Sequence, residues 1–231
     1  MTLVNKNISN LTYLFIISLL LSCSSGQEKK LPQEPISCDI LISNGTIYDG
    51  SGSKPYVGSL AIKEDKIIYV GENTDFQADT VIDATDLAVS PGFINMLSWG
   101  YNSLMNDGRA LSDLKQGVTL EIFGEGTSPG PYWKDGKFTS FGEAMTMLEK
   151  KGVSVNIGSF LGAATTRILE VGYKNRQATP SEMERMRGHV ENSMKEGAMG
   201  IGSSLIYAPG DYASTEEPVS YTHLRAHETL T

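Results

Sequence analysis

The feature that most restricts the fold of this chain is a change of pattern at Pro91. Before it, from Asp39 to Ser90, short runs rich in β-branched residues alternate with turn residues, which predicts a small all-β unit. After it, strand-like runs alternate with amphipathic helix-like runs, which predicts a parallel sheet with helical crossovers. We therefore predict two domains, at residues 38–90 and 91–217.

The first domain is expected to consist of short strands joined by tight turns. The predicted strands are residues 39–42, 46–49, 59–62, 66–70 and 80–83. Asn44-Gly45 separates the first two, and this dipeptide is a strong signal for a two-residue hairpin turn. Together with Thr46 it is also formally a glycosylation sequon, but the hairpin is the interpretation we prefer.

The second domain carries clear helix signals between its predicted strands, which are residues 117–123, 153–160 and 198–202. Ser140 and Glu143 form a capping box for a helix that runs to about Lys151. Thr179-Pro180-Ser181-Glu182 opens a second helix in the same way, and Gly197 ends it. One face of that second helix is apolar, which predicts core packing rather than a binding surface. Its members are Met183, Met186, Val190 and Met194.

The N-terminus resembles a bacterial lipoprotein signal. Lys6 precedes an apolar run from Leu14 to Leu21, which is too short for a membrane span of about 20 residues. The run ends at Cys23 in a lipobox-like context, and a polar tether follows. We expect a signal peptide at 1–22, lipidation of Cys23, a tether at 23–37 and a location in the bacterial cell envelope on a lipid anchor. The alternative is a plain secretory signal with an incidental cysteine.

The net charge and the number of cysteines restrict which partners and which cysteine sites are expected. The formal net charge is −8 with no block of like charge, which argues against nucleic acid, because backbone binding needs a concentrated basic patch. Cys23 and Cys38 are the two cysteines of the sequence. If Cys23 is acylated, Cys38 has no partner, so we expect neither an intramolecular disulfide nor a multi-cysteine zinc site.

Several motifs, in order along the chain, resemble the amidohydrolase superfamily. The run 39–50, leading to Val-Ser-Pro-Gly-Phe-Ile-Asn at 89–95, is similar to the opening of these enzymes. Three later stretches narrow the resemblance to the N-acyl-D-amino-acid deacylase (D-aminoacylase)-like branch; they are residues 116–119, 158–167 and 205–210. The resemblance implies an α/β fold, with a small N-terminal β-sandwich followed by the first half of a (β/α)₈ TIM-type barrel.

The resemblance also implies an activity. Members hydrolyse the amide (C–N, non-peptide) bond of N-acyl-D-amino acids or similar small amides, using zinc or another divalent metal. This sequence departs from the family's ligand pattern: Leu97 and Trp99 stand at the two positions of its His-x-His motif, and Ala163 replaces a third-strand histidine. The family's bridging cysteine on the second strand has no counterpart. Gly124-Glu125-Gly126 stands there, which makes Glu125 the candidate metal ligand or, alternatively, a structural carboxylate between turn glycines.

Two further residues are candidates for substrate contact. Arg167 is placed to pair with a substrate carboxylate, and Tyr207 to donate to the acyl group; each has a structural role as its alternative. The family's catalytic aspartate lies on a later strand, so we expect no catalytic residue of that kind here. The expected partner is a small N-acyl amino acid.

The C-terminal stretch departs from the family. Residues 218–231 lack helical or strand periodicity and resemble translated sequencing-adapter sequence, so we interpret them as a tail foreign to the gene, outside any folded element. His223 and His227, beside Glu228, superficially suggest a zinc-binding helix, a reading we set aside. Residues 91–217 have room for about four βα units, whereas a closed barrel has eight. We expect the fragment to be inactive alone. The rival hypothesis is a non-catalytic cell-surface binding lipoprotein on a degenerate barrel.

Overall fold

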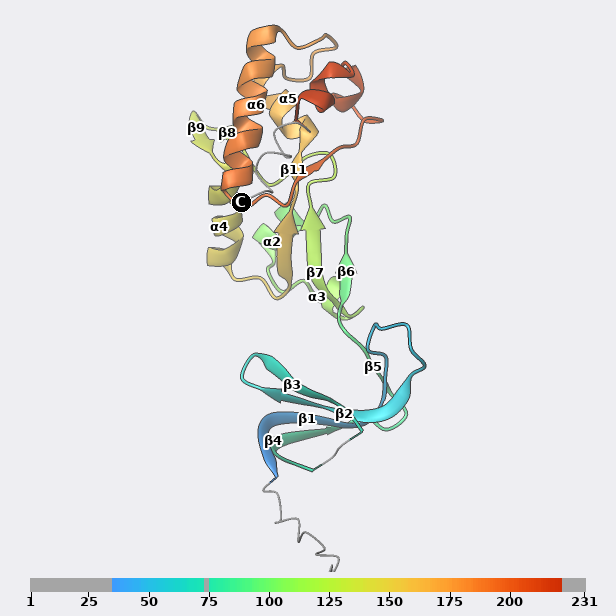
Figure 1. Ribbon diagram of the computed structural model, residues 1–231. Helices are drawn as coiled ribbons and strands as arrows, with labels where there is room; N and C mark the ends of the chain where they lie inside the picture. The colour runs from blue at the N-terminus through green and yellow to red at the C-terminus, as the bar shows by residue number, and fades with distance from the viewer. Residues whose placement is uncertain (1–34, 73–74, 222–231) are drawn as a thin grey trace, which may run out of the picture. The chain divides into compact units, whose positions relative to one another are not determined.

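The structure is a computed structural model that describes residues 35–72 and 75–221 (Figure 1). It divides into two compact units, and the boundary lies between Ser90 and Pro91, where the sequence pattern changes. The predicted signal peptide, Cys23 and most of the tether lie outside the described residues. Within the described part, none of the helices has the length and apolar character needed to cross a membrane.

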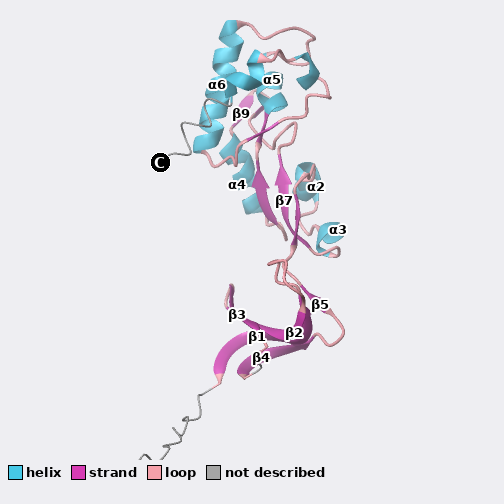
Figure 2. Cartoon of the chain, turned by 45° about the vertical axis from the view of Figure 1, so that its right-hand side comes forward, coloured by secondary structure: helices cyan, strands magenta, loops and turns pink. Residues whose placement is uncertain are grey.

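The N-terminal unit is a five-stranded sheet. Its strands are β1 (Ile36–Ile47), β2 (Tyr56–Lys63), β3 (Lys66–Gly71), β4 (Phe76–Asp83) and β5 (Ala88–Val89). The order is β3-β2-β1-β4, with β5 also paired to β1. Strand β1 runs antiparallel to β2 and parallel to β4 and β5, so it is the centre of the sheet (Figure 2). Its buried cluster is Cys38, Leu41 and Ala61, with Tyr69, Phe76 and Ala78 packed against them.

The predicted hairpin at Asn44-Gly45 is wrong. Strand β1 continues through both residues, and its register with β2 shifts between Ile42 and Gly45, which is a bulge. Asn44 has φ 61°, so the left-handed residue is absorbed inside the strand. The cause lies on the other edge of β1, where parallel pairing with β4 and β5 keeps the strand extended. The Asn44 side chain also donates to Asp83 Oδ1 at 3.1 Å, which ties the bulge to β4.

The C-terminal unit is built on parallel strands. β6 (Phe93–Asn95), β7 (Val118–Phe123) and β10 (Asn156–Ser159) form a parallel sheet in the order β10-β7-β6. After Phe160 the third strand continues as β11 (Leu161–Gly162), which pairs in parallel with β12 (Ile201–Gly202). The predicted parallel sheet is therefore present, with shorter strands than the sequence suggested.

The helices that connect these strands are shown in Figure 2. They are α2 (Tyr101–Asn106), α3 (Leu111–Leu114), α4 (Phe141–Lys151), α5 (Ala163–Glu170) and α6 (Pro180–Lys195). A hairpin of β8 (Tyr132–Lys134) and β9 (Lys137–Thr139) precedes α4, and a 3₁₀ turn spans Gly210–Tyr212. Both predicted capping boxes are formed, at the starts of α4 and α6.

Two hydrophobic clusters stabilise the C-terminal unit. The predicted apolar face of α6 lies in the first, where Met186 and Val190 are fully buried with Phe141 and Leu161 and Met194 packs against them. The interpretation of this face as core is therefore confirmed. The second cluster places the end of β7 against α2 and α4; it comprises Leu104, Ala110, Phe123, Leu148 and Val155.

Part of the stretch that we expected to lie outside any folded element is folded. Residues 216–221 are helical, and Tyr221 is 1% exposed in the same cluster as α6. Pro218 is compatible with this helix because it stands in the first turn, where its missing N–H has no helical partner. The expectation is therefore wrong for residues 218–221. His223, His227 and Glu228 lie outside the described residues.

Candidate active site at the strand ends

The loop that contains Glu125 follows β7 at its carboxyl end, and backbone hydrogen bonds fix it on both sides. The Phe160 amide donates to the Phe123 carbonyl at 2.9 Å, and the Ala164 amide donates to the Gly126 carbonyl at 3.0 Å. Phe160 lies between β10 and β11, and Ala164 lies in the first turn of α5. The loop is therefore tied to the next βα unit at the end of the sheet where parallel α/β proteins bind their ligands.

Glycines allow this loop to lie directly on its neighbours. A Cβ on Gly202 would lie 2.1 Å from the Gly124 carbonyl oxygen and 3.1 Å from the Glu125 Cα. A Cβ on Gly162 would lie 2.4 Å from the Gly126 carbonyl oxygen. Gly124 itself has φ 96°, a conformation that side chains disfavour. Backbone therefore packs on backbone, and the position of Glu125 is strongly determined.

The Glu125 side chain has no polar partner in the described part of the chain. It is half-buried, and no hydrogen bond or ion pair reaches it from residues 35–72 or 75–221. A carboxylate held in place by a rigid loop and left without a polar partner is chemically able to bind a metal ion.

A second glutamate nearby has a structural role that the sequence analysis missed. Glu121 of β7 is 2% exposed and accepts a hydrogen bond from Ser98 Oγ at 2.5 Å. Ser98 Oγ in turn accepts from the Gly100 amide, where α2 begins. The signal was a charged residue inside the apolar run Val-Thr-Leu-Glu-Ile-Phe, which requires a buried partner.

The two residues at the His-x-His positions are exposed and apolar. Leu97 is 53% exposed and Trp99 is 59% exposed. A Cβ on Gly126 would lie 3.4 Å from the Trp99 ring and 3.1 Å from the Ser204 Cβ. The indole therefore lies beside the loop that bears Glu125.

The described residues do not by themselves fit a two-metal centre. Leu97 and Trp99 have no lone pair to donate, and Ala163 is a buried methyl group at the start of α5. Within residues 35–72 and 75–221, no three His, Cys, Asp or Glu side chains come together as a potential metal site. Among the residues that the structure describes, Glu125 is the candidate ligand at the strand ends.

Arg167 is not available to a substrate, which corrects its assignment as a substrate-binding candidate. Its side chain is completely buried, and it forms an ion pair with Glu217 at 2.5 Å. Nη2 also donates to the Arg176 carbonyl at 2.5 Å and, more weakly, to the Tyr212 carbonyl at 3.4 Å. Burial raises the pKa of Glu217, and Arg167 opposes that rise.

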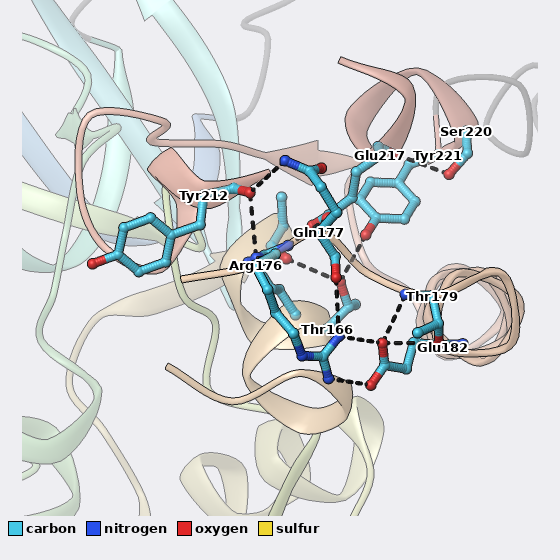
Figure 3. A network of polar contacts seen from close by, with 11 residues as sticks. Thr166, Arg176, Gln177, Thr179, Glu182, Tyr212, Glu217, Ser220 and Tyr221 are labelled. Atoms are coloured by element: carbon cyan, nitrogen blue, oxygen red, sulfur yellow. Dashed lines mark hydrogen bonds and ion pairs between the residues drawn. The ribbon is translucent and has the colours of Figure 1, made fainter. Parts of the chain in front are cut away.

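Figure 3 shows the polar network around this ion pair. It joins α6, through the bidentate pair of Arg176 with Glu182, to the carbonyl of Tyr212 and to Glu217. The network links three segments that are distant in sequence. Arg167 therefore stabilises the packing of the segments after β12 instead of facing the strand ends.

Tyr207 lies in the turn that follows β12. Its amide donates to the Ser204 carbonyl at 3.3 Å, and its side chain is 60% exposed. Because Ser204 lies against Gly126, this turn reaches the loop of Glu125. The structure thus brings Glu125, Trp99 and the turn of Tyr207 to one end of the sheet, whereas the Arg167 side chain is held in its ion pair with Glu217.

Over most of its length the chain is similar to D-aminoacylase and related deacylases. No protein-family model matches the chain. The D-aminoacylase of Alcaligenes xylosoxydans xylosoxydans is 29% identical over 205 residues, which are 82% of this chain and 42% of that protein. The N-acyl-D-aspartate deacylase of the same organism is 27% identical over 202 residues, 81% of this chain and 41% of that protein. The chain thus spans about two-fifths of the length of these curated relatives.

The solved structures agree. A D-aminoacylase structure that concerns the functional role of its binuclear metal centre superposes with a TM-score of 0.78 at 25% identity, over 83% of this chain and 44% of that one. An N-acyl-D-glutamate deacylase from Bordetella bronchiseptica, complexed with zinc and a phosphonate inhibitor, shares the fold with a TM-score of 0.73 at 21% identity, over 83% and 43%. Sequence and fold therefore both match this chain to the D-aminoacylase-like branch of the amidohydrolases.

Proposed function

We propose that the protein to which this chain belongs hydrolyses the amide bond of N-acyl-D-amino acids or similar small amides. The observation that supports this most directly is Glu125: a carboxylate without a polar partner in the described chain, held by glycine contacts at the carboxyl ends of parallel strands. By the sequence resemblance, its loop corresponds to the position of the family's metal-bridging cysteine. The relatives named for such hydrolysis match over most of this chain, but over less than half of their own length.

The described strands are, in this proposal, the first half of a TIM-type barrel that later strands complete. Apolar side chains that a closed barrel would cover support it; they are Ile94, Met96, Leu97, Leu205 and Ile206, all at least 46% exposed. Open sheet edges and an uncovered apolar face are unfavourable in an isolated domain. The chain alone should therefore be inactive.

The proposed cofactor is zinc or another divalent metal. Because the described residues supply one candidate ligand, Glu125, the remaining ligands and the proton-transferring aspartate would come from the later strands. The proposed metal centre accordingly has fewer ligands than the family pattern supplies, because the apolar Leu97 and Trp99 contribute none.

The test uses the complete protein and paired variants. Release of the free amino acid from N-acetyl-D- and N-acetyl-L-amino acids is measured alongside metal content by elemental analysis. Glu125→Gln is expected to lower both metal content and turnover, whereas Glu149→Gln, on the exposed face of α4, leaves both unchanged. Unchanged metal stoichiometry with unchanged turnover would show that Glu125 is only a turn residue. A protein that hydrolyses no N-acyl-D-amino acid would favour the alternative, a non-catalytic cell-surface binding lipoprotein.

We further propose that the protein is exported and anchored in the bacterial cell envelope through lipidated Cys23. The support is the short apolar run, the lipobox-like context and the polar tether in the sequence. Mass spectrometry of the mature N-terminus tests this. Cleavage at another position, or an unmodified Cys23, would contradict it.

A further inference from the structure

The turn that follows β6 carries the two positions at which the family has its His-x-His metal ligands. Leu97 and Trp99 stand there, and neither side chain has a lone pair for a metal ion, because the indole nitrogen is a donor only. Ala163, at the start of α5, likewise stands where the family often has a histidine. An ion that these positions would hold must find other ligands at this strand end or remain unbound.

The oxygen atoms at the same strand end are already used by the protein. The side-chain oxygen of Asn95 accepts a hydrogen bond from the Leu97 amide at 3.2 Å. Ser98 Oγ accepts from the Gly100 amide at 3.1 Å and donates to Glu121 at 2.5 Å. Glu121 is 2% exposed, and a Cβ on Gly100 would lie 2.7 Å from its Oε2. These three side chains are therefore engaged within the turn, and none of them replaces a missing imidazole.

The Trp99 ring takes up space beside the candidate ligand. A Cβ on Gly126, the residue after Glu125, would lie 3.4 Å from Cη2 of the ring. The ring therefore reaches from the end of β6 to the loop of Glu125, which is the space that an ion shared between these two strand ends would need. An apolar ring in that space disfavours a bound charge.

We propose that the complete protein holds one metal ion per chain, and that Leu97 and Trp99 remove the second site. The inference rests on the proposed function, in which Glu125 and residues of later strands bind the first ion. It departs from the D-aminoacylase relative, whose centre is binuclear, with activation by one metal and attenuation by the second. Because the second site is missing here, excess metal should not attenuate hydrolysis by this protein.

Metal content tests the inference without a measurement of activity. The complete protein is stripped with a chelator, equilibrated with excess zinc chloride, desalted and measured by elemental analysis. The parent should retain about one zinc per chain, and Leu97→His with Trp99→His should retain about two, because two imidazole ligands are restored. Two ions or none in the parent would overturn the inference, whether or not the variant folds. A single ion in the folded variant would also overturn it.

Two control variants separate restored ligands from other effects. Leu97→Ile with Trp99→Phe changes the same positions without adding a ligand, and it should retain about one ion. Gln77→His with Asp79→His places histidines at the same spacing on exposed residues of β4, in the N-terminal unit, and it should also retain about one. A second ion in either control would overturn the assignment of the missing site to Leu97 and Trp99.

Hydrolysis in excess zinc distinguishes this inference from the proposed function. Turnover of an N-acyl-D-amino acid by the parent should stay constant as zinc rises beyond one ion per chain. Turnover by Leu97→His with Trp99→His should fall as the second ion binds. Attenuation of the parent would overturn the inference and leave the proposed function intact. Retention of one ion without hydrolysis of any N-acyl-D-amino acid would overturn the proposed function and leave the inference.

Discussion

The backbone amide of Ala164 donates a hydrogen bond of 3.0 Å to the carbonyl oxygen of Gly126. Ala164 lies in the first turn of α5, so this bond satisfies one of the amides that every helix leaves unpaired at its start. The same bond fixes the loop of Glu125. The helix after the third strand and the loop after the second strand are thus stabilised together, and a disturbance of either should affect both.

Gly202→Ala should destabilise the C-terminal unit by about 1–3 kcal/mol, because the new methyl group would meet the Gly124 carbonyl oxygen at 2.1 Å. Urea unfolding measures the loss. Gly188→Ala is the control: it lies in α6 with open space around it, and it should stabilise the helix by up to about 1 kcal/mol. Equal stability of the two variants would refute the close backbone contact.

Arg167→Met should cost about 3–5 kcal/mol, because it leaves the buried Glu217 carboxylate without its cation. Adding Glu217→Leu removes that uncompensated charge, so the double variant should be more stable than the single variant. Thermal unfolding of the set gives the comparison. A double variant as unstable as Arg167→Met would mean that shape, not charge, determines the contribution of Arg167.

Glu182 should make the stability of the C-terminal unit depend on pH. The hydrogen bond from Arg176, followed by that from the Thr179 amide, holds the pKa of Glu182 well below its ordinary value of 4.5. A carboxyl with a lowered folded pKa contributes stability above its unfolded pKa, and this is lost as pH falls through the folded pKa. Glu182→Gln, which keeps a capping oxygen, should therefore lower the urea midpoint at pH 7, and the difference from the parent should shrink below about pH 4. A difference that is constant with pH would contradict this.

Ser98→Ala should destabilise the start of α2 by about 1–3 kcal/mol, because the buried Glu121 carboxylate loses its hydroxyl donor. Ser112→Ala, an exposed serine of α3, is the matched control and should have an effect within about 0.5 kcal/mol. Denaturant unfolding distinguishes them. If both variants unfold at the same midpoint, Glu121 has another partner.

The sequence predicted those features that depend on local chemistry. The capping boxes at Ser140 and Thr179 need only residues three positions apart, and both formed. The Asn44-Gly45 turn failed because β4 and β5, which lie far along the chain, keep β1 extended.

In the candidate site, too, the roles that depend on residues distant in the sequence could not be predicted. Glu125 could be placed because the resemblance positions it directly after a strand. The role of Arg167 depended on Glu217, fifty positions away, and nothing local indicates that pairing. The role of Glu121 depended likewise on Ser98, which reaches it only through the fold.

The backbone packing around Glu125 has a consequence for sequence change. Glycine backbone sets how closely the loop approaches β11 and β12. Three glycines cannot be replaced without moving the carboxylate, because a Cβ added to each would lie 2.0–2.4 Å from a carbonyl oxygen. They are Gly124, Gly162 and Gly202. Homologues that keep a glutamate after the second strand should therefore keep these three glycines as a set, and those that lose one should lose the glutamate with it.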